Sequence, residues 1–481
     1  MKTAGIAITI SLLLPFSAIH AQFADSLEVR TGTRATIATK GYQPLWLTAN
    51  KFGTISDRKS DLSTYIRATN THTFGAGQNW RLQYGFSLYN NNNFRRNFFE
   101  EAFVKFAFQK LELRVGRYEE IIGDVAPELS SGSLGVSGNA LPIPKVSIGL
   151  KEYVPVPFTN GWLQVKGQFS HGWMGRNQFI PYAFLHEKNF YLRIGKKKLK
   201  AYGGIQHYAV WGGNREDLPK IKSSFKDYMD VVLVKEGDDG TVLTDQVRPN
   251  RPGDHRGVLE GGLEWENDNF ALRAYNQTPF ETGQGVDFKN TDHLMGLSFR
   301  DKREGAVLLQ ATVEWISTKK MNNWHPKQYR ESYYNNGVYL TGWEYENHII
   351  GTPLFVNRSR GQHYFGNIQP FDYSEKWNVI RNKGWNIINN RVSGMHLGAL
   401  YRVGSMLQGK TMLTYTRNFG TYDPGPIKAP LSQWYALQQV RYSAPVPGLT
   451  LTGAVGLDGG DMSKTAGFML GVEWLFAPAR R

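Results

Sequence analysis

Apolar and polar residues alternate in short segments along almost the whole chain. A period of two is typical of β-strands whose two faces meet different surroundings, and helical spacing is almost nowhere sustained. The pattern therefore predicts an all-β protein, with sixteen to twenty strands by a loose count. The clearest segments are residues 80–89, 163–170, 259–266, 307–315 and 395–403.

The polar faces of these segments distinguish between two all-β architectures. A soluble sandwich of this length would need about two domains and a visible linker, and no Pro/Ser-rich or charged linker divides the chain. A transmembrane barrel instead turns its apolar residues to lipid and accepts Glu, Lys, Gln and Gly in its lumen. The sequence thus predicts a transmembrane antiparallel outer-membrane β-barrel.

The C-terminal segment favours the same interpretation. Its apolar face is unbroken and includes two aromatic residues close to the end. Such a terminal strand resembles the signal that the barrel assembly machinery of the outer membrane recognises. We therefore expect this machinery to be a partner during biogenesis. The apolar face comprises Ala466, Phe468, Leu470, Val472, Trp474 and Phe476.

The N-terminus carries the features of an export signal. Lys2 gives a positive start, residues 4–14 are apolar, and the run Ser17 to Ala21 resembles a cleavage site. We predict a cleaved signal peptide over 1–21, a short periplasmic segment over 22–32 and a single barrel domain over 33–481. The chain is then an integral protein of the outer membrane of a Gram-negative bacterium.

Long irregular segments orient the barrel, because such barrels have short periplasmic turns and long extracellular loops. Residues 212–256 form a charged segment that we interpret as a solvated excursion. Residues 319–390 are rich in Trp, Tyr and Asn, which a loop that needs only solubility does not accumulate.

Composition narrows the function further. The chain has 481 residues and no cysteine, which excludes disulfides, thiolate nucleophiles, cysteine metal sites and a lipoprotein anchor. Its formal net charge of +15 favours an anionic partner, whether acidic capsule, lipopolysaccharide phosphates or lipid head groups. Nucleic acid is not expected for an exported barrel.

A series of short sequence motifs lies between residues 116 and 213. These motifs are Gly116–Tyr118, Leu129–Leu134, Ser137–Lys145, Lys166–Trp173, Leu185–Tyr191 and Gln206–Gly213. Together and in this order they resemble the capsule-assembly Wzi family of Gram-negative outer-membrane proteins, densely over about a hundred residues and more loosely elsewhere. The family's members from capsule-bearing enteric bacteria carry a periplasmic helical bundle, but here only about ten residues separate Gln22 from the first strand-like run near Thr33.

The resemblance implies a barrel of about 18 strands that holds or organises surface polysaccharide as a lectin and is not an enzyme. Two other functions stay open. The chain could be a porin or a substrate-specific channel for anions or oligosaccharides, or a structural subunit of a larger complex with other outer-membrane proteins. We expect no cofactor, and outer-membrane lipid and lipopolysaccharide as surroundings.

A polysaccharide site needs flat apolar faces for sugar rings, with amide and charged groups beside them. The segment 319–390 supplies these residue types, with two arginines available for acidic sugars. The alternative is that its aromatics pack the loop onto itself. The candidate binding residues are Trp324, Tyr333, Tyr334, Asn335, Trp343, Tyr345, Arg358 and Arg360.

Other titratable residues give no catalytic or metal site. His171, His186 and His207 lie on or near different strands, and we expect them to form buried hydrogen bonds in the lumen. Glu100 and Glu101 are adjacent, so in a regular strand their side chains point to opposite faces. Neither group therefore supports paired acid–base chemistry or a metal centre.

Overall fold

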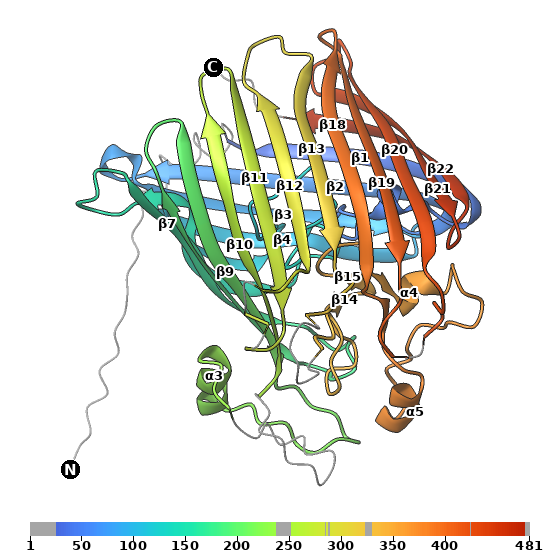
Figure 1. Ribbon diagram of the computed structural model, residues 1–481. Coiled ribbons are helices and arrows are strands. Elements are labelled where there is room, and N and C mark those ends of the chain that lie inside the picture. Colours follow the sequence, from blue (N-terminus) through green and yellow to red (C-terminus); the bar gives the residue numbers. More distant parts are fainter. Residues whose placement is uncertain are drawn as a thin grey trace, which may run out of the picture.

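The computed structural model describes residues 26–236, 252–283, 285–286, 289–322, 330–423 and 425–476. Eighteen of its strands form one antiparallel sheet, in which each strand pairs with the next along the chain (Figure 1). The first strand also pairs with the last, with Val29 opposite Phe476. The sheet is therefore a closed barrel, and the predicted fold class is confirmed.

The strands of the barrel differ in length, and their numbering passes from β13 to β18 because four short strands lie inside one loop. None of the helices among the described residues is long and apolar enough to cross a membrane. The barrel strands are β1 (Glu28–Tyr42), β2 (Arg58–Phe74), β3 (Trp80–Asn91), β4 (Arg96–Phe108), β5 (Leu111–Arg117), β6 (Lys145–Pro155), β7 (Leu163–Trp173), β8 (Phe184–Ile194), β9 (Leu199–Trp211), β10 (Asp254–Glu266), β11 (Phe270–Phe280), β12 (His293–Asp301), β13 (Leu308–Ser317), β18 (Val392–Val403), β19 (Leu407–Asn418), β20 (Leu431–Ser443), β21 (Leu449–Gly460) and β22 (Thr465–Phe476).

The two faces of each strand meet different surroundings. On β22, Phe468 is 51% exposed, whereas its neighbour Met469 is only 6% exposed because it points into the barrel. The same alternation recurs on the other strands, so large apolar side chains form an outward belt. Such a belt is what a lipid bilayer requires of a spanning barrel.

Long and short connections lie at opposite ends of the barrel. The connections after β1, β5, β9 and β13 are long and lie at one end, where α3 (Phe225–Val232) and α5 (Trp377–Asn382) are seen in Figure 1. The tight turns, the first residues of β1 and the last residues of β22 lie at the opposite end of the barrel. We call these the long-loop end and the short-turn end, and the rule for outer-membrane barrels makes the first extracellular.

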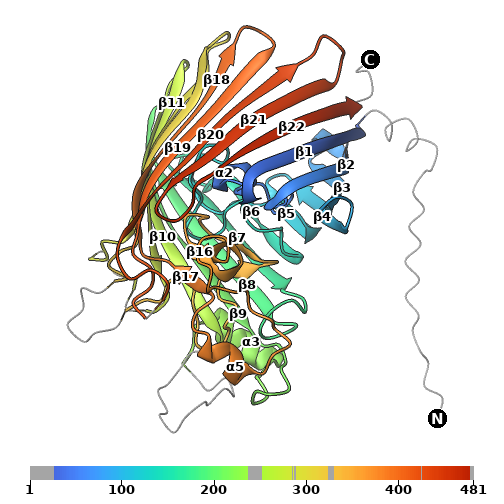
Figure 2. The same cartoon turned by 90° about the vertical axis from the view of Figure 1, so that its right-hand side faces the viewer.

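Three of the long connections fold into the lumen and together form a plug. They are residues 43–57, with α2 (Leu45–Thr48), residues 118–144, and the described residues of 318–391 (318–322 and 330–391), with α4 (Arg358–Gly361) and four short strands. Figure 2 shows α2 and two of these strands within the outline of the barrel wall. The short strands are β14 (Glu344–Tyr345), β15 (His348–Ile349), β16 (Val356–Asn357) and β17 (Ile387–Asn389).

Polar contacts and small residues attach the plug to the wall. Ser130 Oγ and the backbone N–H of Ser131 both donate to Glu314 on β13, at 2.6 Å each. A Cβ atom on Gly467 of β22 would lie 2.5 Å from the ring of Pro44, so glycine is what allows α2 to approach the wall. The plug is thus packed against the barrel and does not hang loosely in its lumen.

The chain departs from the predicted boundaries in two places. Strand β1 begins at Glu28, earlier than the predicted start near Thr33, because its first residues pair with β2 on one side and β22 on the other. Within 212–256, helix α3 has a capping box formed by Ser224 and Asp227, and β10 already begins at Asp254. The predicted signal peptide over 1–21 lies outside the described residues, as do residues 237–251.

Candidate functional site

A recess at the long-loop end is bounded by residues 45–58, by the β3–β4 turn and by residues 346–370 of the plug. We call this cavity of about 400 Å³ the outer recess. Thr48, Ser56 and Asn91 are buried in its floor, whereas Arg58 and Asn347 are exposed at its rim. The recess therefore opens to the outside of the molecule. Its polar lining residues are Thr48, Ser56, Asp57, Arg58, Asn91, Asn92, Arg96, Asn139, Glu346, Asn347, His348, Asn357, Ser359, Arg360 and Gln362.

Three guanidinium groups face two carboxylates in this recess. Arg96 lies 3.8 Å from Glu346 and 4.5 Å from the ring centroid of Phe98, so it is held in place. Among the described residues, the exposed guanidinium of Arg58 has no ion-pair partner. Arg58 is thus available to an anionic or hydroxylated ligand.

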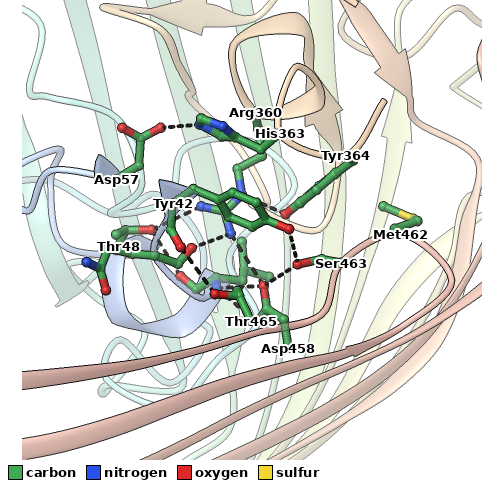
Figure 3. Close-up of polar contacts among 12 residues, drawn as sticks. Tyr42, Thr48, Asp57, Arg360, His363, Tyr364, Asp458, Met462, Ser463 and Thr465 are labelled. Atoms are coloured by element: carbon green, nitrogen blue, oxygen red, sulfur yellow. Dashed lines mark hydrogen bonds and ion pairs between the residues drawn. The ribbon is translucent and has the colours of Figure 1, made fainter. Parts of the chain in front are cut away.

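Arg360 is more fully engaged than the other two arginines. Its Nε donates to the hydroxyl of Tyr364 at 2.6 Å, and another nitrogen donates to the carbonyl of Gln43 at 3.1 Å. The same guanidinium lies 3.6 Å from Asp458 on β21. Figure 3 shows Arg360 and Tyr364, from residues 318–391 of the plug, close to Asp458 of the wall. Arg360 therefore joins three parts of the fold at the base of the recess.

The carboxylate of Asp57 is fixed next to this group. His363 Nε2 lies 3.3 Å from Asp57 Oδ2, and the imidazole stacks on Tyr42 at 4.8 Å between centroids (Figure 3). Burial by itself raises the pKa of Asp57, but the hydrogen bond with His363 and the charge of Arg360 outweigh it and lower this pKa to about 2. Asp57 is therefore charged at neutral pH.

Amide groups form the side of the recess that the plug provides. Asn357 donates to the carbonyl of Asn347 at 2.9 Å and to the buried carboxylate of Glu344 at 2.6 Å. Ser359 donates to the side-chain oxygen of Asn347 at 3.2 Å, and Gln362 donates to the carbonyl of Ser359 at 2.9 Å. The rim amides are thus held by neighbours while still reaching solvent.

Most of the predicted binding residues lie inside the plug rather than at its surface. Trp343 is 0% exposed, and its Nε1–H donates to the carbonyl of Gly135 at 2.7 Å. Tyr334 donates to the carbonyl of Leu134 at 2.7 Å. Both aromatic side chains therefore connect residues 318–391 to residues 118–144 through hydrogen bonds.

The remaining predicted residues are also engaged within the protein. Tyr333 donates to Asp292 at 2.9 Å, and Asn335 donates to the carbonyl of Ile387 at 2.9 Å. Tyr345 accepts from Arg117 at 3.1 Å, while Arg358 donates to the carbonyl of Trp385 at 2.9 Å. Trp324 lies outside the described residues, and of the seven other predicted residues Arg360 alone lines the outer recess.

Sequence reasoning missed the part of the recess that comes from the first two hairpins. Asn91, Asn92 and Arg96 belong to a turn region whose asparagine run, residues 90–93, was a visible signal. Asp57 and Arg58 close the 43–57 segment, which the search for long irregular segments did not include. Its apolar run Leu45 to Leu47, in a position between two strands, was the available sign that it folds inward.

Two expectations about titratable residues are wrong. A register shift between Ser87 and Leu88 leaves one residue of β4 unpaired, so both Glu100 and Glu101 are buried, not on opposite faces. With Glu119 they bring carboxylate oxygens within 4.8 Å of one another. Arg67 lies 2.9 Å from both Glu101 and Glu119, so a guanidinium already compensates much of this charge.

The histidines point outward instead of into the lumen. His171 shares its face of β7 with the exposed Phe169 and Trp173, and the Tyr228 ring of α3 lies 5.3 Å from it. His186 lies 5.9 Å from the same ring. Helix α3 folds back over the outer wall and covers these imidazoles, which limits their exposure although they face outward.

Comparisons with known proteins agree with this architecture. A family model described as capsule assembly protein Wzi matches residues 29–365. Among solved structures, Escherichia coli Wzi is 12% identical with a TM-score of 0.59, over 96% of this chain and 87% of that one. It is described as an outer membrane protein involved in group 1 capsule assembly and as a carbohydrate-binding β-barrel.

More distant barrels also align. Pseudomonas aeruginosa OccK5 (OpdH) is 10% identical with a TM-score of 0.45, over 94% of this chain and 99% of that one. P. aeruginosa OccK3 (OpdO) is 10% identical with a TM-score of 0.47, over 95% of this chain and 97% of that one. No curated protein sequence matches the chain.

Proposed function

The chain belongs to the capsule assembly protein Wzi family, and on that premise we propose that it is a non-enzymatic outer-membrane lectin. Its long-loop end binds surface polysaccharide and helps to retain or organise it at the cell surface. The protein reaches the outer membrane of a Gram-negative bacterium after cleavage of its signal peptide and assembly by the barrel machinery. Lipid and lipopolysaccharide surround its apolar belt.

The outer recess is the observation that carries this proposal. It combines an exposed guanidinium on Arg58 with rim amides on Asn347 and Gln362, at the end of the barrel that faces the outside. Amide and guanidinium groups match the hydroxyls and carboxylates of a polysaccharide, and the amides of Asn347 and Gln362 are held by neighbouring groups before a ligand arrives. A fixed site loses little conformational entropy on binding.

The predicted aromatic residues enter the proposal as the framework of the site. Trp343 and Tyr334 hold residues 318–391 against 118–144, and Arg360 holds the same segment against the wall. In this proposal the glycan touches the rim, while these buried side chains keep the rim in place. Replacing them lowers affinity by loosening the recess, not by removing a sugar contact.

The plug favours binding over conduction. Residues 43–57, 118–144 and 318–391 fold into the lumen and contribute Trp46, Leu134 and Trp343 to one buried cluster with the wall. A channel for anions or oligosaccharides would need a continuous path past these segments. Binding at the outer recess needs no such path.

Retention of polysaccharide by whole cells tests the proposal. Cells that produce the Arg58→Gln/Asn347→Ala variant should release polysaccharide into the medium, as cells without the gene do. Arg402→Gln removes one positive charge from an exposed position at the short-turn end and should leave retention unchanged. Equal retention with and without the gene would contradict the proposed function.

A further inference from the structure

A second hollow lies in the lumen on the opposite side of the 43–57 segment. Two adjoining cavities, of about 610 Å³ and about 200 Å³, share the lining residues Arg34, Lys51 and Arg441, and Lys410 lines the larger one. The smaller cavity reaches Thr450 and Glu473, which lie near the short-turn ends of β21 and β22. We call the two cavities together the basic chamber.

Four separate parts of the chain supply its positive charges. Arg34 is on β1, Lys51 on the inward segment after it, Lys410 on β19 and Arg441 on β20. Lys410 is 6% exposed, whereas Arg441 is exposed to solvent within the lumen. The cations therefore extend from an enclosed floor towards an open side.

The carboxylates that line the chamber are mostly engaged elsewhere. Glu120 pairs with Arg114 and Lys145, each at 2.7 Å. Glu119 pairs with Arg67 at 2.9 Å, and Glu473 accepts from Tyr65 at 2.6 Å.

Glu128, an exposed residue that lines the larger cavity, is the carboxylate near Lys51 and Lys410 that is not engaged elsewhere. Among the described residues, no ion pair joins Arg34, Lys51, Lys410 or Arg441 to a carboxylate. Glu128 is thus the nearby counter-charge of the two lysines, and Glu473 is that of Arg34.

The two lysines are also unusually close to each other. Both line the larger cavity, where their ammonium groups repel each other. The charge of Lys410, together with burial, lowers the pKa of Lys51 well below its ordinary value. Like charges held together in an enclosed space destabilise the empty chamber, and an anion between them would relieve that repulsion.

Aromatic and amide groups surround the cations. The guanidinium of Arg34 lies 4.7 Å from the ring centroid of Tyr65, which stacks on Tyr89 at 5.0 Å between centroids. Gln439 lines both cavities. The two buried rings hold Arg34 in place, and the amide and the cations are groups that recognise the oxyanion and hydroxyls of a sugar bearing an acidic substituent.

We propose that the basic chamber binds a sugar bearing a carboxylate or phosphate group, which enters from the short-turn end and places its oxyanion between Lys51, Lys410 and Arg441. This site is separate from the outer recess and does not depend on the proposed function of that recess. Orientation of the barrel makes it accessible from the periplasm.

Calorimetric titration of the full-length protein in detergent tests this assignment at low ionic strength. The probes are inorganic phosphate, glucose 1-phosphate, glucuronate and neutral glucose. We expect saturable binding of the anions and none of glucose. Binding of glucuronate alone would identify carboxylate as the preferred group, and binding of the two phosphates alone would identify phosphate.

Variants separate the chamber from the general positive charge of the barrel. Lys51→Gln/Arg441→Gln should weaken anion binding at least tenfold, whereas Lys198→Gln, at an exposed turn of the same end, should not change it. Arg58→Gln in the outer recess should also leave it unchanged. The double variant should remain folded without ligand, because it removes repulsion, and the gel mobility of the unheated barrel checks this.

Arg441→Gln alone serves as a second variant if the double one does not fold, because Arg441 is solvent-exposed. The proposal is overturned if none of the three anions binds saturably. It is also overturned if the chamber variant binds them as tightly as the Lys198→Gln control.

Discussion

The guanidinium of Arg360 lies 3.6 Å from the carboxylate of Asp458, although the two residues belong to different parts of the barrel. Arg360 is in the plug, and Asp458 is on β21 in the wall. Asp458 also accepts hydrogen bonds from the backbone N–H of Leu45, at 3.1 and 3.2 Å. One buried carboxylate therefore holds two inward segments at the base of the outer recess.

Replacing Arg360 should loosen the plug. The side chain is 14% exposed and its partner carboxylate 0%, so Arg360→Ala leaves a buried charge without its counter-ion, at a cost of roughly 3 kcal/mol. We expect earlier unfolding in denaturant and faster proteolysis within residues 318–391. Arg303→Ala, at an exposed turn, is the control, and equal stability of the two variants would refute the role of the pair.

Trp343 should act through packing rather than through contact with a glycan. Trp343→Ala removes a fully buried ring and should cost roughly 4 kcal/mol, while Trp343→Phe keeps most of the packing and loses the bond to Gly135, at about 1 kcal/mol. Glycan affinity should follow stability across the two variants. Lost affinity in a Trp343→Phe protein of near-native stability would instead indicate direct contact.

Stability should fall as the pH rises from about 4.5 to about 7. Burial raises the pKa of Glu344 to about 7, although hydrogen bonds from Asn357 and Asn386 oppose it. In this interval the native protein holds a proton that the unfolded chain, with an ordinary value of 4.5, has released. The native state therefore loses roughly 3 kcal/mol of stability on the way to neutral pH.

Unfolding midpoints measured between pH 4 and pH 8 check this prediction. Glu344→Gln should reduce the decline of stability with pH and should be more stable than the wild type at pH 8. Glu304→Gln, at an exposed turn, should show the same decline as the wild type. A decline of the same size in Glu344→Gln would show that another group is responsible.

The protein should conduct almost no current across a planar bilayer. Deletion of most of residues 324–386 should raise the conductance only in part, because residues 43–57 and 118–144 remain in the lumen. Gel mobility of the unheated deletion variant shows whether the barrel has formed. Large, stable currents from the intact wild-type protein would favour a channel over a lectin.

The barrel could be predicted from sequence because lipid forces a period of two on every strand. Phe468, Leu470 and Val472 face outward, and their alternation was visible without any knowledge of their partners. The inward-facing side of the fold was harder to predict from the sequence. The bulge at Glu100 depends on how β4 pairs with β3, which a single strand's pattern does not record.

The position of the binding residues was the least predictable feature. Trp343 and Tyr334 are residue types that serve equally well against a sugar ring or within a core. Their partners, Gly135 and Leu134, are about 200 residues away in the chain, so burial follows from tertiary contacts that composition cannot reveal. Rim residues such as Asn92, in the β3–β4 turn, and Arg58, at the start of β2, carry little signal of their own.

The most direct test of the central claim is the affinity of the purified protein for polysaccharide extracted from its own cells. The account predicts saturable binding that Arg58→Gln/Asn347→Ala weakens about tenfold and that Arg402→Gln leaves intact. A steep decrease with salt would further indicate an acidic glycan. Absence of binding by the folded wild-type barrel, or equal binding by the rim variant, would contradict a lectin site in the outer recess.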